Sequence, residues 1–110
     1  LFIDPNLKDI KIAKELNADC IELHTGKISD LVKNKKRYKK EYKKIKTCCV
    51  LAKKIGIDVH VGHGLDYKTT TILSKIKEIT EFNIGHFIIG ESLTYGLNNT
   101  IKKFKKILDK

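Results

Sequence analysis

The sequence predicts an α/β fold in which four parallel strands alternate with helices. Short apolar runs alternate with amphipathic stretches along the chain, and each stretch is long enough to cross back over a sheet. Polar and glycine-rich residues follow three successive strands. The length of 110 residues fits one domain, and 41% hydrophobic residues are typical of a globular chain rather than a disordered one.

The first half of the chain contains two of the expected strand and helix units. Leu1-Phe2-Ile3 forms a short apolar run, after which Asp4 is expected to cap a helix that has Pro5 at its first position and ends near Asn17. Polar and apolar residues alternate over residues 19–24, which predicts a strand. The pattern then predicts one long amphipathic helix from Leu31 to Ile55, with Gly56 as its cap.

The second half repeats the same order of elements. Residues 57–61 read as a strand, and a helix is expected from Thr69 to Ile79. A fourth strand begins at Phe82. The last helix has a single apolar stripe, made of Leu97, Ile101, Phe104, Ile107 and Leu108.

Four such units amount to half of an eight-stranded (β/α)8 barrel, which typically takes about 250 residues. Because the chain enters directly on a strand, we expect residues 1–110 to be the C-terminal half of one barrel domain, with the N-terminal half missing. Alone, such a half would leave unpaired strand edges, so it needs its other half as a partner. An open four-stranded sheet is the alternative.

Charge and cysteine content restrict the class of protein. The net charge is +10, but every basic residue except Arg37 is Lys, and the run from Lys33 to Lys46 reads as a solvated helix face rather than a nucleic-acid site. No stretch resembles a membrane span or a signal peptide. The chain has an odd number of cysteines, Cys20, Cys48 and Cys49, which we expect to be packing residues in a reducing compartment. A cytoplasmic location is therefore expected. Neither nucleic acid nor a membrane is expected as a partner.

Candidate chemistry lies at the carboxyl ends of the strands, where parallel sheets carry their active sites. Glu22, His24 and Cys20 are two residues apart and share one face of a strand. If that face is the barrel interior, an unpaired Glu22 would have a raised pKa and could hold developing positive charge or move a proton. A structural ion pair between Glu22 and a lysine of a neighbouring strand is the alternative.

His63 is the best candidate acid or base, because Gly62 and Gly64 flank it and leave the backbone open to a ligand. The N–H of Gly64 is available to an anion. Gly85 and His86 precede an apolar stretch that can begin a helix, which predicts a second anion site at its N-terminus. Loop residues that only shape turns are the alternative in both places.

The remaining histidine is expected to play another part. His60 is an odd number of residues from His63, so we expect it to face the other way, toward the core or a helix. The histidines do not follow a ligand spacing, and no metal site or cofactor is expected.

Three segments together resemble the C-terminal half of the pyridoxine 5′-phosphate synthase family. They are Ile21-Glu22-Leu23-His24-Thr25-Gly26, Val61-Gly62-His63-Gly64-Leu65 with Tyr67, and residues 82–90, and Leu1-Phe2-Ile3-Asp4 fits before them. Each is weak alone, but their order and spacing are specific, and the match runs essentially end to end.

The resemblance implies a (β/α)8 barrel that condenses 3-amino-2-oxopropyl phosphate with 1-deoxy-D-xylulose 5-phosphate to give pyridoxine 5′-phosphate, phosphate and water. It implies that Glu22 stabilises the transition state and that His63 donates a proton. Gly64, Gly85 and His86 would bind the aminoketone phosphate. Members form homo-octamers, and residues 27–46 are a candidate for such contacts.

The sequence departs from the family at two places. His60-Val61 stands where Asn-Ala is usual, and Lys27-Ile28-Ser29 stands where an aromatic residue is usual. The family's two general bases belong to the N-terminal half, so the chain alone is expected to be inactive. Two alternatives stay open: another phosphate-binding barrel enzyme, and a basic module that binds nucleic acid with strong salt dependence.

Overall fold

The computed structural model describes residues 1–109 of the chain, which alternate between strands and helices as expected. The elements run in the order β1 (Phe2–Ile3), α1 (Leu7–Glu15), β2 (Cys20–His24), α2 (Gly26–Lys33), α3 (Lys39–Lys54), β3 (Asp58–Gly62), α4 (Tyr67–Leu73), β4 (Ile79–Asn83), α5 (His86–Tyr95) and α6 (Leu97–Leu108).

The strands form one sheet in the order β1-β2-β3-β4, and every neighbouring pair is parallel. This confirms the expected α/β fold, and it is the arrangement of half a (β/α)8 barrel. Glu22 lies beside His60 across the β2–β3 pair, and His24 lies beside Gly62. The β3–β4 register shifts between Val59 and His60.

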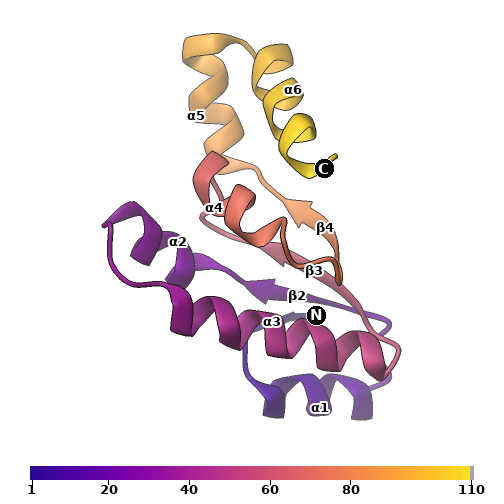
Figure 1. Ribbon diagram of the computed structural model, residues 1–110. Coiled ribbons are helices and arrows are strands. Elements are labelled where there is room, and N and C mark those ends of the chain that lie inside the picture. The colour runs from indigo at the N-terminus through magenta and orange to yellow at the C-terminus, as the bar shows by residue number, and fades with distance from the viewer. Residues whose placement is uncertain (110) are drawn as a thin grey trace.

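One face of the sheet is covered by helices and forms the core (Figure 1). The strand residues on this face are fully or almost fully buried: Ile21, Leu23, Val59 and Val61. They share one apolar cluster with residues of α1 and α3. Cys48 and Cys49 belong to this cluster and form no disulfide, so their expected role as packing residues is confirmed.

The opposite face of the sheet carries the polar residues of the same strands. Cys20 and Glu22 are half-buried and His24 is exposed, whereas Ile21 and Leu23 between them are fully buried. The period of two along β2 therefore separates the residues as expected, with polar side chains on one face and core side chains on the other.

The helices α5 and α6 lie side by side beyond β4, at the far end of the molecule from α1 (Figure 1). The stripe on α6 meets the rest of the protein mainly through Phe104, which is buried and whose ring lies 4.6 Å from that of Tyr67 at the start of α4. Leu97 and Leu108 on the same stripe stay exposed. The predicted final helix is confirmed, but its apolar stripe is only partly covered.

The expectation of one long helix from Leu31 to Ile55 is wrong, because the segment contains two helices. Lys35 adopts a φ of 55°, which ends α2. The N–H of Lys36 donates to the carbonyl of Leu31 at 2.8 Å, and that of Lys35 donates to Val32 at 3.1 Å. This pair of bonds is a Schellman motif, which usually has Gly at the left-handed position. Gly56 caps α3 in the same way, as expected.

The helix expected from Thr69 to Ile79 is also shorter, since α4 ends at Leu73 and β4 already begins at Ile79. Ile76 in the connecting turn and Ile79 in the strand are both buried. The apolar spacing therefore continued through a turn and into β4, which begins three residues before the expected Phe82.

The cap of the first helix lies later in the chain than expected. Asn6, and not Asp4, is the N-cap of α1, and its side chain accepts a hydrogen bond from the N–H of Asp9 at 2.7 Å. Asp4 instead accepts through its carbonyl from the N–H of Asn6. Among residues 1–109, no helix has the length and apolar character that crossing a membrane requires.

Candidate functional site

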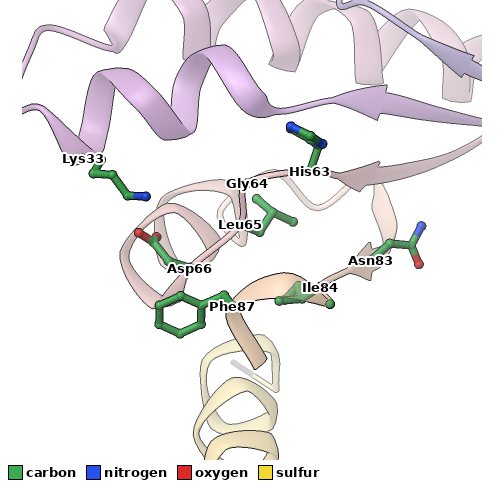
Figure 2. A pocket seen from close by; sticks show the side chains of 9 residues that line it. Lys33, His63, Gly64, Leu65, Asp66, Asn83, Ile84 and Phe87 are labelled. Carbon is green, nitrogen blue, oxygen red and sulfur yellow. The ribbon is translucent and has the colours of Figure 1, made fainter. Parts of the chain in front are cut away.

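The carboxyl ends of β3 and β4 open onto a cleft of about 310 Å³ (Figure 2). Figure 2 shows the loop after β3 between Lys33 of α2 on one side and the loop after β4 on the other. The cleft is lined by Lys33, His63, Gly64, Leu65, Asp66, Asn83, Ile84, Gly85 and Phe87. Its position at this edge of the sheet is the one that parallel α/β folds use for ligands.

The cleft brings together three of the five predicted site residues, His63, Gly64 and Gly85. Glu22 does not line it but is joined to it, because the side-chain amide of Asn83 donates a hydrogen bond to Oε1 of Glu22. His86 is the first residue of α5, and its side chain lies outside the part of the chain that the structure describes.

The carboxylate of Glu22 is held between two strands on the polar face of the sheet. Asn83 reaches it from β4, and Gly62 leaves room for it on β3. The partner of Glu22 is therefore an amide donor rather than the lysine of the alternative interpretation. An amide neutralises no charge, so the carboxylate keeps its ability to stabilise a positive charge that develops nearby.

His63 lies just beyond β3 in a backbone conformation that residues other than glycine rarely adopt. Its φ is 85°, and its exposed ring stacks on that of His24, with centroids 4.3 Å apart and planes 26° apart. Gly26 makes this pair possible, since a Cβ atom there would lie 2.7 Å from Cε1 of His24 and 3.0 Å from Cδ2 of His63. The imidazole of His63 is thus presented at the edge of the cleft with a free path to solvent.

Gly64 brings the backbone of the loop close to α2. Its φ is 73°, and a Cβ atom on it would meet the Cβ of Ser29 at 3.2 Å. The hydroxyl of Ser29 is buried and has no hydrogen-bond partner within residues 1–109. Both the dihedral angle and the close approach favour glycine here.

The loop after β4 presents the start of α5 to the cleft. Gly85 is the N-cap residue, and no side chain caps the free N–H groups of the first turn. Such groups favour an anion. Lys33 is the only lysine or arginine among the described residues that line the cleft. The carboxylate of Asp66 already serves as the N-cap of α4, where it accepts from the N–H of Thr69 at 2.8 Å.

His60 does not face the core or a helix, and that expectation is wrong. It lies beside Glu22 on the polar face, with Sγ of Cys20 3.4 Å from its ring nitrogens and Oε1 of Glu81 3.7 Å from its Nδ1. His63 lies past the end of β3, where side chains no longer alternate between the two faces of the sheet, so the odd spacing between His60 and His63 does not predict the face of His60. Burial raises the pKa of the Cys20 thiol. Within residues 1–109, no three such ligand side chains converge as a metal site requires.

Two residues at the site were not singled out from the sequence. The sequence pattern predicts Asn83 only as part of a strand, although its position two residues before Gly85 places it at the same edge. The pattern predicts Thr25 only as the end of a strand, yet its buried hydroxyl bonds to the loop that carries His63. Both act on residues 37 or more positions away, so spacing along the chain could not reveal them.

The family model described as "Pyridoxal phosphate biosynthesis protein PdxJ" matches residues 1–110 of this chain. The chain belongs to the PdxJ family. This confirms the resemblance drawn from the three motifs, and it places the cleft in a family of (β/α)8 barrels.

Three relatives of this PdxJ family member have one name in common. A protein of Pelagibacter ubique named pyridoxine 5′-phosphate synthase is 76% identical over 110 residues, which cover all of this chain and 46% of the relative. Proteins of the same name from Zymomonas mobilis and a Sulfurihydrogenibium species are 42% and 43% identical, over 99% and 98% of the chain and 42% and 44% of their own lengths. The chain spans about half the length of the curated relatives it matches.

Proposed function

We propose that this chain is the C-terminal half of a pyridoxine 5′-phosphate synthase barrel and carries its acid and its phosphate site. The enzyme would condense 3-amino-2-oxopropyl phosphate with 1-deoxy-D-xylulose 5-phosphate, releasing phosphate and water as pyridoxine 5′-phosphate forms. The observation that carries this proposal is the cleft that joins His63, Gly64 and Gly85, in a chain 76% identical to a protein of that name.

The phosphate of the aminoketone would lie between the two loops of the cleft. The N–H of Gly64 and the first-turn amides of α5, starting with Gly85 and His86, would bind its oxygens. Lys33 would add a positive charge from α2. Glycine at 64 and 85 supports this role, because the absence of a side chain lets the backbone come close to a phosphate.

The proton chemistry would fall to the two side chains near this phosphate. His63 would donate a proton to the leaving oxygen, which suits an exposed imidazole at the edge of the cleft. Glu22 would stabilise the positive charge that develops on the substrate nitrogen, which suits a carboxylate that is held by Asn83 and has no cationic partner among the described side chains. The general bases and most contacts to the deoxyxylulose phosphate would belong to the other half of the barrel.

The enzyme would be a transferase-type synthase of the cytoplasm that uses no resident cofactor, and the complete protein would form homo-octamers. The segment around α2 and α3 is the candidate for contacts between copies.

The test uses a barrel chimera, in which this chain replaces the segment it matches in the Pelagibacter ubique relative. We expect the chimera to form pyridoxine 5′-phosphate from the two phosphorylated substrates, and we expect the 110 residues alone to form none. A folded chimera without product would contradict the proposed function. Product from the chain alone would contradict the assignment of the general bases to the other half.

A further inference from the structure

The side chain of Thr25 connects the end of β2 to the loop that carries His63. Thr25 is fully buried, and its Oγ1 lies within donor distance of two consecutive carbonyl oxygens, 2.7 Å from Gly62 and 2.9 Å from His63. Its backbone N–H also donates to the carbonyl of Gly62, at 2.9 Å. Thr25 is the N-cap residue of α2, but its side chain makes no capping bond to that helix. Its hydroxyl therefore bonds to the loop after β3 and not to the helix.

The two carbonyls belong to the two peptide planes on either side of the His63 Cα. Each plane is rigid and also contains the next N–H, so fixing the carbonyl of Gly62 fixes the N–H of His63. Fixing the carbonyl of His63 likewise fixes the N–H of Gly64. Because residues 1–109 contain no cis peptide bond, each N–H points opposite to its carbonyl, and the N–H of Gly64 points away from Thr25.

These hydrogen bonds hold a segment of the backbone that is in an unfavourable conformation. His63 has a φ of 85°, a conformation that brings Cβ close to the neighbouring carbonyl and that residues other than glycine rarely adopt. A carbonyl that accepts a hydrogen bond also makes the N–H of its own peptide a stronger donor. A hydroxyl carries one hydrogen, so Oγ1 of Thr25 shares it between the two carbonyls, while the N–H of Thr25 also donates to that of Gly62. Thr25 thus bears on both the direction of the His63 side chain and the donor strength of the Gly64 amide.

We propose that Thr25 is a positioning residue, which clamps the two peptide planes around His63 and thereby aims the imidazole of His63 and the N–H of Gly64 at the phosphorylated substrate. This inference rests on the proposed function for the roles of His63 and Gly64. Thr25 itself is fully buried and is not one of the residues that line the cleft.

The test compares two substitutions of Thr25 in the barrel chimera. Thr25→Val keeps the shape of the side chain and removes the hydroxyl, and we expect kcat to fall about tenfold and KM for the aminoketone phosphate to rise severalfold. Thr25→Ser keeps the hydroxyl, and we expect both constants to return to within about twofold of the unsubstituted chimera. Equal losses in the two variants would overturn the proposal, because the hydroxyl would then not be the cause.

Thr70→Val is the matched control. Thr70 is as fully buried as Thr25, but its hydroxyl has no partner within residues 1–109. Its removal should leave kcat and KM unchanged. Thermal unfolding of all variants shows whether a loss of activity follows a loss of folded protein.

A readout independent of turnover separates this proposal from the proposed function. In ¹⁵N-labelled chimera, Thr25→Val should shift the Gly64 amide and His63 ring resonances, whereas Thr25→Ser and Thr70→Val should leave them in place. If the unsubstituted chimera makes no product, the proposed function fails, and these resonances still decide whether Thr25 clamps the loop. Unshifted resonances in folded Thr25→Val would overturn the clamp.

Discussion

A Cβ atom on Gly62 would lie 2.5 Å from Oε2 of Glu22 and 2.9 Å from its Cδ. The bare backbone of β3 is therefore what leaves space for the carboxylate that β2 presents. The same Cβ would meet that of Asn83, the hydrogen-bond donor to Glu22, at 3.3 Å. The φ of Gly62 lies outside the left-handed region, so space for the carboxylate, and not an unusual backbone, explains glycine at this position.

Gly62→Ala tests whether the position of Glu22 matters for turnover. The new methyl group should displace the carboxylate and weaken its bond to Asn83, so we expect kcat of the barrel chimera to fall about tenfold or more. Steady-state kinetics with both substrates measures the effect. Gly90→Ala is the control, since Gly90 lies within α5 with open space at its Cβ, and this change should stabilise the protein by about 0.5–1 kcal/mol with kcat unchanged. Wild-type kcat in Gly62→Ala would contradict the role of Glu22.

Gly64→Ala tests the phosphate site. The substitution places a methyl group 3.2 Å from the Cβ of Ser29 at a φ of 73°, so the loop must move away from α2. We expect the affinity of the chimera for inorganic phosphate, measured by isothermal titration calorimetry, to fall about tenfold.

Gly56→Ala provides a matched control for that experiment. Gly56 has a similar φ of 85°, but nothing lies within 4 Å of its Cβ position. It caps α3 just before the amino end of β3, whereas the cleft lies at the carboxyl end of that strand. The change should cost about 1 kcal/mol of stability without altering phosphate affinity. Equal phosphate affinities in the two variants would count against Gly64 as a ligand.

The buried cysteines predict how stability depends on pH. Burial raises the pKa of the Cys49 thiol from 9.0 to about 12, with Cys48 beside it adding to the shift. Between pH 9 and 12 the unfolded chain loses this proton while the folded chain keeps it. The free energy of unfolding should therefore fall as pH rises through this window, with a contribution from Cys49 of about 1.4 kcal/mol per pH unit.

Urea unfolding at several pH values measures this dependence. Lysines and tyrosines also titrate in the window, so Cys49→Ala is compared with the unsubstituted chimera, and the difference between their slopes isolates the thiol. We expect the variant to lose stability less steeply above pH 9. Parallel pH dependences would show that Cys49 ionises equally in both states.

Local pattern was enough to predict the order of the fold but not its turns. The period of two along β2 placed Glu22 and His24 on one face and Leu23 on the other, because burial of one sheet face dictates that alternation. The break after α2 was missed because lysine occupies the left-handed position, where glycine or asparagine normally marks the end of a helix. Ile79 continued a helical spacing because the core needs an apolar residue there in a strand as well.

The candidate site was predictable where it follows from topology. Parallel strands end at the same edge, so His63, Gly64 and Gly85 were expected together and do line one cleft. The contacts of Glu22 with Asn83 and of Thr25 with Gly62 depend on strand register and loop geometry. Neither is encoded in local spacing, because a shift of one residue in register would bring other side chains together.

The most direct test of the account is the turnover of the barrel chimera with and without the imidazole of residue 63. We predict that His63→Asn lowers kcat about 100-fold or more while the KM for the aminoketone phosphate stays within a fewfold, because only the proton donor is lost and the phosphate site remains. A folded His63→Asn chimera that forms pyridoxine 5′-phosphate at the unsubstituted rate would contradict the account.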